Sequence, residues 1–145
     1  MRILLDTNVI LDIFLDREPF VDDAGLIWKA HEEERLTAYI SAITPVNLFY
    51  IARKLQGREI ATRAVYRLVA TLPVTTVNQS VLESGLLLGF EDFEDAVQHA
   101  SAEAHGLDAI ITRNIADFAS ARLEVFAPGD FIKKYQEIFE NLVID

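Results

Sequence analysis

Short apolar segments that alternate with longer segments of helical periodicity constrain the fold of this chain most strongly. The first apolar segment, 2–5, has the pattern of a short buried strand, and the chain turns polar at Asp6 directly after it. Further strands are expected at 36–40, 74–77, 109–111 and 123–126. Helices are expected at 8–15, 21–35, 44–56, 59–71, 80–88 and 95–106, and from Asp130 onward. Strands separated by helices favour a parallel sheet, so the sequence predicts an α/β fold.

Length and composition are consistent with one unit of ordinary size. The 145 residues suit a single domain, and a hydrophobic content of 51% is enough for a packed core. No repeat, low-complexity stretch or flexible linker divides the chain, so residues 1–145 are predicted to form one domain. The chain has no cysteine, which excludes disulfides and cysteine-ligated metal centres.

The amino-terminal segment is apolar, but polar residues interrupt it well short of a secretory core or a membrane span. These residues are Asp6, Asn8 and Asp12. A soluble, cytoplasmic protein with no membrane partner is therefore expected.

Local patterns give three further expectations. Thr44 followed by Pro45 is typical of a helix start, with the Thr44 hydroxyl as the cap. Asp130 is expected to cap the last helix. His99 is expected on the polar side of its helix.

Three acidic residues stand where predicted elements change direction. Asp6 follows the first strand, Asp117 follows the strand at 109–111, and Asp95 begins the helix between them. Ligands of open α/β sheets gather at the carboxyl ends of the strands, so the three carboxylates are expected to share one crevice. Hard divalent cations prefer such oxygen ligands. Each acid also has a simpler explanation as a helix cap or a first-turn acid, with Asp92 as the cap before Asp95.

The order of three motifs resembles the PIN-domain nucleases. The motifs are DTN at Asp6, a helix start of the DA type at Asp95, and TRNIADF, which contains Asp117. The resemblance covers almost the whole chain. It implies a Rossmann-like PIN domain, with a mainly parallel central sheet flanked by helices, that hydrolyses RNA phosphodiester bonds as an endoribonuclease dependent on Mg²⁺ or Mn²⁺. It also implies the toxin of a toxin–antitoxin pair, an antitoxin protein as partner, and a homodimer formed through the helices from Thr44 and Glu59.

The resemblance assigns roles to individual residues. The expected catalytic and metal-binding residues are Asp6, Asp95 and Asp117. The expected supporting residues, which would orient ligands or water, are Asn8, Asn47, Thr112 and Asn114.

The chain departs from the family at Asn47, where PIN domains commonly carry a glutamate. An amide oxygen ligates a cation more weakly than a carboxylate does, so a lower metal affinity is expected. Asp92, which shares a helix face with Asp95, is the first substitute for the missing charge, and Asp12 is the second.

The net charge of −10 argues against broad affinity for nucleic acids, because carboxylates repel a phosphate backbone. The charge is uneven, however, since the stretch 53–67 carries basic side chains against Glu59 alone. The candidate RNA-binding residues are Arg53, Lys54, Arg58, Arg63 and Arg67, together with Arg113 from the TRN motif. A solvated helical face is the simpler explanation of this stretch, and Arg113 can instead pair with an acid.

Two classes of function remain open. The first is the metal-dependent ribonuclease. The second is a catalytically weak or inactive PIN-like domain that binds RNA or a protein, which Asn47 and the net charge of −10 suggest. An unrelated metal-dependent phosphohydrolase is less favoured, because the chain has no nucleotide-binding loop of the GxxxxGK or GxGxxG type.

Overall fold

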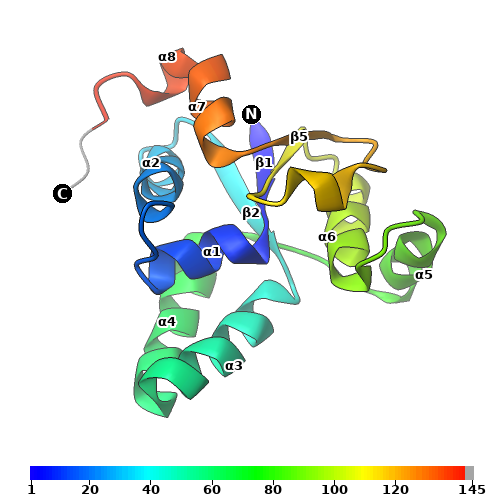
Figure 1. Ribbon diagram of the computed structural model, residues 1–145, viewed down its shortest axis with the longest axis horizontal. Coiled ribbons are helices and arrows are strands. Elements are labelled where there is room, and N and C mark those ends of the chain that lie inside the picture. Colours follow the sequence, from blue (N-terminus) through cyan, green and yellow to red (C-terminus); the bar gives the residue numbers. More distant parts are fainter. Residues whose placement is uncertain (143–145) are drawn as a thin grey trace.

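Five parallel strands form one central sheet in the computed structural model, which describes residues 1–142 (Figure 1). The strand order is β3–β2–β1–β4–β5. The strands are β1 (Arg2–Leu5), β2 (Thr37–Ser41), β3 (Val74–Thr75), β4 (Ala109–Ile111) and β5 (Glu124–Phe126). The central strand β1 pairs with β2 on one side and β4 on the other, so that Ile3 lies opposite both Ala38 and Ala109. The predicted parallel α/β fold is confirmed.

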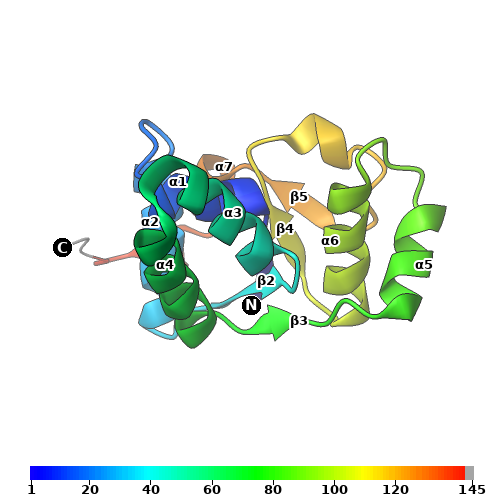
Figure 2. The same ribbon diagram turned by 90° about the horizontal axis from the view of Figure 1, so that it is seen from below.

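Helices connect the strands and cover both faces of the sheet. They are α1 (Thr7–Phe14), α2 (Val21–Glu32), α3 (Thr44–Gln56), α4 (Arg58–Thr71), α5 (Gln79–Leu87), α6 (Phe93–Ala104), α7 (Pro128–Lys134) and α8 (Gln136–Phe139), with a 3₁₀ helix η1 (Ile115–Phe118). Figure 2 shows α1, α2, α3 and α4 on one side of the strands and α5 and α6 on the other. No helix within residues 1–142 has the length and hydrophobicity needed to cross a membrane.

Alternation along β1 divides the core between the two faces of the sheet. Ile3 and Leu5 pack into the larger core, which also contains Ile10 and Ile27 from the first two helices. Leu4 points to the other face and packs with Ala102 of α6 and other buried residues. All three β1 side chains are fully buried. The sheet is therefore covered on both sides, as parallel sheets require.

Two expected helix caps are wrong. Ile43 is the N-cap of α3, and the Thr44 hydroxyl instead hydrogen-bonds the Thr7 hydroxyl at 2.9 Å. Asp130 lies in the first turn of α7, which begins at Pro128 after the N-cap Ala127. Both corrections have the same cause: the chain enters each helix before the residue whose side chain suits a cap.

The last three residues of the predicted domain, 143–145, lie outside the described part of the chain.

Candidate active site

Asp6 is a buried carboxylate held by uncharged hydrogen-bond donors. It follows β1 as the N-cap residue of α1, and only 2% of its surface is exposed. Gln98 Nε2 donates to Asp6 Oδ1 at 2.9 Å, and Thr112 Oγ1 donates to Asp6 Oδ2 at 2.7 Å. Burial raises the pKa of Asp6, and these hydrogen bonds only partly oppose that rise. The site therefore favours an external positive charge beside Asp6.

Gln98 also connects α6 to the start of α1. Its side-chain oxygen accepts a hydrogen bond from the Thr7 backbone N–H at 3.2 Å, while its amide nitrogen serves Asp6. Gln98 is fully buried, so both ends of its amide need partners, and both have them. This residue was not predicted from the sequence. The only signal was its position three residues after Asp95, on the same face of the helix.

Asp95 lies in the first turn of α6, as the sequence predicts. Asp92 is the N-cap of this helix, and its Oδ1 accepts a hydrogen bond from the Asp95 backbone N–H at 3.2 Å. Desolvation raises the pKa of Asp95 to about 7, and the neighbouring carboxylates of Asp6, Asp92, Asp117 and Glu94 add to the rise. Carboxylates from three separate segments therefore lie close enough to Asp95 to disfavour its charged form.

Glu94 is an acidic residue of this crevice that was not predicted from the sequence. Its Oε1 accepts a hydrogen bond from Asn47 Nδ2 at 2.7 Å. Partial desolvation raises the pKa of Glu94, and the charges of Asp92 and Asp6 add to the rise, although the residue as a whole is exposed. Its signal in the sequence was its place between two acids already singled out, in the run EDFED.

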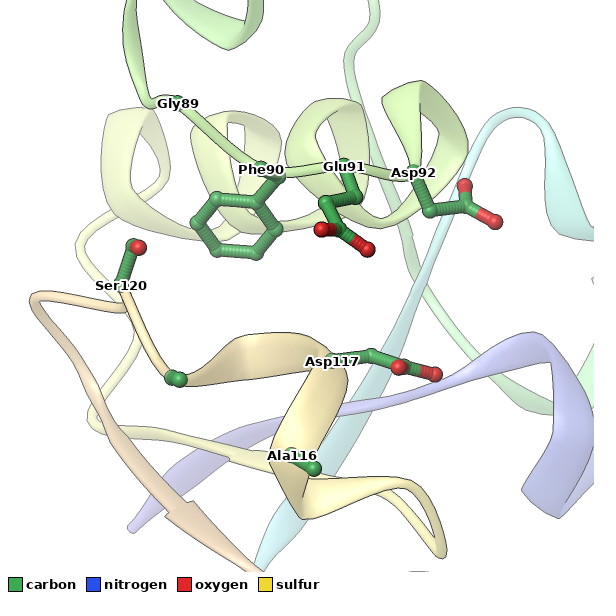
Figure 3. A pocket seen from close by; sticks show the side chains of 8 residues that line it. Gly89, Phe90, Glu91, Asp92, Ala116, Asp117 and Ser120 are labelled. Atoms are coloured by element: carbon green, nitrogen blue, oxygen red, sulfur yellow. The ribbon is translucent and has the colours of Figure 1, made fainter.

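Asp117 reaches the crevice from the opposite side. It belongs to η1, and its exposed carboxylate raises the pKa of Asp95. Between η1 and the segment before α6 lies a cavity of about 740 Å³, into which Glu91 and Phe90 point from above (Figure 3). Asp92 and Asp117 line this cavity from its two sides. It is an open hollow next to the carboxylates of Asp92 and Asp117.

A family profile described as "PIN domain" matches residues 2–116. The chain belongs to the PIN-domain family. The match ends close to Asp117, so it includes β1, the start of α6 and most of the TRNIADF motif that carried the resemblance.

Solved structures share the fold of this PIN domain. A chain of a toxin–antitoxin complex from Klebsiella pneumoniae is 28% identical, with a TM-score of 0.64, and the match covers 86% of this chain and 96% of that one. A chain of VapBC-1 from nontypeable Haemophilus influenzae is 19% identical, with a TM-score of 0.68 and coverage of 89% and 99%. Mycobacterium tuberculosis VapC20, described as a toxin that cleaves the sarcin–ricin loop, is 16% identical, with a TM-score of 0.61 and coverage of 74% and 86%. No curated protein matches the sequence.

The donor set of this PIN domain suits a hard divalent cation. Every ionisable group that raises the pKa of Asp95 is a carboxylate, and oxygen is the ligand that Mg²⁺ and Mn²⁺ prefer. Within residues 1–142, no three acidic or imidazole side chains converge closely enough to make a ready-formed metal site. The residues fit the cation by the chemistry of their oxygen donors.

Asp12 is not available as the additional carboxylate that the sequence suggested. Arg113 donates to it twice, from Nε to Oδ2 at 2.7 Å and from a terminal nitrogen to Oδ1 at 3.2 Å. The Arg17 guanidinium lies 3.9 Å from the same carboxylate, and Asp12 is only 1% exposed. The charge of Asp12 is thus balanced within the protein. Arg113 was considered as an RNA-binding residue or as the partner of an acid, and the structure shows it paired with Asp12. Its guanidinium also stacks on the Phe20 ring, 4.0 Å from the ring centre.

Three of the four expected supporting residues contact Asp6 or Glu94, and the fourth, Asn114, contacts Thr112. Thr112 touches the site directly, because its hydroxyl donates to Asp6 and accepts from the Asn114 backbone N–H at 3.0 Å. Asn47 touches it through Glu94. Asn8, in the first turn of α1, reaches Asp6 through its backbone N–H, which opposes the rise in the pKa of Asp6. Asn114 is exposed just before η1.

The basic stretch lies on the hairpin of α3 and α4, whose helices extend away from the sheet (Figure 1). Its five basic side chains are exposed: Arg53, Lys54, Arg58, Arg63 and Arg67. Arg63 lies 3.9 Å from Glu59, and Arg67 stacks on the rings of Phe14 and Trp28. The hairpin therefore carries several exposed basic side chains on a protein whose net charge is −10.

Proposed function

We propose that this PIN domain is a metal-dependent endoribonuclease and the toxin of a toxin–antitoxin pair. The observation that carries the proposal is that the carboxylates of Asp6, after β1, and Asp117, in η1, both act on Asp95 at the start of α6, in a chain of this family. Desolvation and the charges of Asp6 and Asp117 raise the pKa of Asp95, and no basic side chain hydrogen-bonds to these three carboxylates among residues 1–142. Such a site repels an RNA phosphate unless cations are bound.

The proposed catalytic residues are Asp6, Asp95 and Asp117, which would hold Mg²⁺ or Mn²⁺, with Asp92 beside them. A divalent cation at such a site supplies Lewis acidity and lowers the pKa of water that it binds. Gln98 and Thr112 fix both oxygens of Asp6, so this carboxylate does not need to reorient. Asp95, with a pKa of about 7, gives up its proton near neutral pH as a cation enters.

The substrate would approach through the cavity between Asp92 and Asp117. The proposed RNA-binding residues are those of the α3–α4 hairpin, which would contact phosphates remote from the cut. The setting proposed for this reaction is the cytoplasm.

An antitoxin protein is the proposed partner. Support comes from the similar chains of known structure, since those from Klebsiella pneumoniae and Haemophilus influenzae belong to complexes described as toxin–antitoxin and VapBC. A homodimer is also proposed, through α3 and α4. These helices expose large apolar side chains: Val46, Tyr50, Leu55, Ile60, Tyr66 and Val69.

The test measures Mg²⁺ and Mn²⁺ binding by calorimetry and RNA cleavage on the same samples of wild type and Asp95→Asn. The proposal expects the wild type to bind and cut, and the variant to lose both activities. A wild-type protein that neither binds metal nor cuts any RNA would identify instead the inactive RNA- or protein-binding domain that Asn47 and the acidic charge suggest.

A further inference from the structure

A polar pair joins α3 to α6 at the edge of the acidic site. Asn47 Nδ2 donates to Glu94 Oε1 at 2.7 Å, across 47 residues of sequence. The charges of Asp92 and Asp6 act on the Glu94 carboxyl, and Thr7 lies close enough to hydrogen-bond to it. Glu94 shares the first turn of α6 with Asp95, directly after the N-cap Asp92.

Hydrogen bonds from neighbouring turns hold the two helices that carry this pair. Thr44, one turn before Asn47 on α3, hydrogen-bonds the Thr7 hydroxyl at 2.9 Å. Gln98, one turn after Glu94 on α6, hydrogen-bonds both Asp6 and the Thr7 backbone N–H. Polar contacts thus link the starts of three helices in pairs. Thr7–Thr44 links α1 and α3, Thr7–Gln98 links α1 and α6, and Asn47–Glu94 links α3 and α6.

The chemistry of the pair leaves the negative charge of Glu94 intact. An asparagine amide orients a carboxylate through a neutral N–H, whereas a guanidinium would also cancel its charge. A glutamate at position 47 would instead set two carboxylates within hydrogen-bond distance, and the like charges would repel each other. An amide at position 47 and a carboxylate at position 94 are therefore complementary.

We propose that Glu94, oriented by Asn47, supplies the further carboxylate of the cation site, in the place that a glutamate at position 47 would otherwise fill. This inference rests on the proposed metal-dependent function. Compared with a chain that has a glutamate at position 47, the carboxylate lies on α6 and not on α3, at the other end of one hydrogen bond. The number of carboxylates at the site is then the same. Asn47 is then a positioning residue and not the mark of a reduced site.

The decisive variant is Glu94→Gln, because a glutamine oxygen still accepts the hydrogen bond from Asn47 while the charge is lost. Mn²⁺ binding to the full chain is measured by calorimetry, and unfolding by urea in EDTA serves as the check on folding. The inference expects the Kd for Mn²⁺ to rise at least about tenfold, with no loss of metal-free stability. The matched control is Glu83→Gln, which changes an exposed glutamate of α5 whose Oε1 accepts a hydrogen bond from Gln79, and its Kd for Mn²⁺ stays within about twofold of wild type.

The exchange variant Asn47→Glu/Glu94→Gln returns the carboxylate to α3. It is expected to bind Mn²⁺ within about threefold of wild type. A purely structural hydrogen bond between α3 and α6 predicts instead that Glu94→Gln binds Mn²⁺ as wild type does, and that result overturns the inference while the proposed function stands. An exchange variant that stays as weak as Glu94→Gln also overturns it. Wild-type protein that binds no Mn²⁺ and cuts no RNA overturns both proposals.

Discussion

Asp6 and Asp12 are buried aspartates six residues apart, and the protein treats their charges in opposite ways. Asp12 receives two hydrogen bonds from the Arg113 guanidinium, so its charge is balanced within the fold. Asp6 receives its hydrogen bonds from the neutral side chains of Gln98 and Thr112, with more carboxylates nearby. A buried charge paired with a cation serves the fold, whereas one held by neutral donors favours a cation from outside.

The largest effect is expected at the balanced aspartate. Arg113→Leu removes both hydrogen bonds that the guanidinium donates to the buried Asp12 carboxylate. The Arg17 guanidinium, 3.9 Å away and too far for a hydrogen bond, then remains beside it. We expect a loss of roughly 3 kcal/mol in the free energy of unfolding, measured by urea denaturation in EDTA. The control is Arg63→Leu, which breaks an exposed pair with Glu59 and should cost less than about 0.5 kcal/mol. Equal losses in the two variants would mean that Asp12 is not stabilised by its partner.

The opposite sign is expected at the acidic site. Asp95→Asn removes a charge that desolvation and four neighbouring carboxylates disfavour, so the metal-free protein should gain about 1–2 kcal/mol at pH 8, a value reduced because the side chain is only half buried. Because the pKa of Asp95 is raised from 3.8 to about 7, its contribution to stability is complete below pH 3.8 and is lost as the pH rises through 7. The gain should therefore shrink as unfolding is repeated at lower pH. A variant that is less stable than wild type at pH 8 would contradict this account.

Protons should compete with metal for the same carboxylates. Since Asp95 binds a proton with a pKa of about 7, the affinity for Mn²⁺ should fall up to about tenfold for each pH unit below 7 and level off above it. Calorimetry in buffers of different ionisation enthalpy measures the proton released on binding. An affinity that does not change between pH 6 and pH 8 would show that Asp95 is not a ligand.

The smallest effect on stability is expected on the basic hairpin. The double variant Arg58→Gln/Arg63→Gln should change the free energy of unfolding by less than about 0.5 kcal/mol, because both side chains are exposed. It should weaken binding of single-stranded RNA and reduce the salt dependence of the binding constant by about 0.7 for each phosphate that the variant no longer neutralises.

The matched control for the hairpin is Lys133→Gln/Lys134→Gln on α7, at the opposite end of the molecule from α3 and α4 (Figure 1). It removes the same charge and should leave RNA binding unchanged. If both double variants weaken binding equally, only the net charge matters and the hairpin has no special role.

The sequence predicted features that depend on neighbours along the chain. The strand pattern of 2–5, the cap at Asp92 and the place of Asp95 in a first turn all follow from local periodicity and helix-end chemistry. The burial of His99 did not follow: the residue is fully buried, with Nε2 accepting hydrogen bonds from the backbone N–H groups of Arg122 and Leu123 and with Nδ1 unpaired within residues 1–142. Backbone donors far away in the sequence help to hold such a polar residue inside a protein.

The finer structure of the site depends on contacts between residues far apart in sequence. The partners in Asn47–Glu94, Asp6–Gln98 and Asp12–Arg113 are separated by 47, 92 and 101 residues. Local patterns carry no information on such pairs, so the sequence offered Asp12 and Asp92 as substitutes for the missing carboxylate, and the place of Glu94 in the run EDFED did not single it out. The type of site was predictable, but the way in which each carboxylate is held was not.

The position of β1 at the centre of the sheet has a consequence for the order in which the protein is made. The strand is translated before the other four strands, yet one of its two neighbours, β4, is translated only at residues 109–111. Asp6 then acquires its last hydrogen-bonding partner at Thr112. A nascent chain that ends before this point has no complete sheet and no complete acidic site. The acidic site can therefore form only after the chain has been synthesised as far as Thr112.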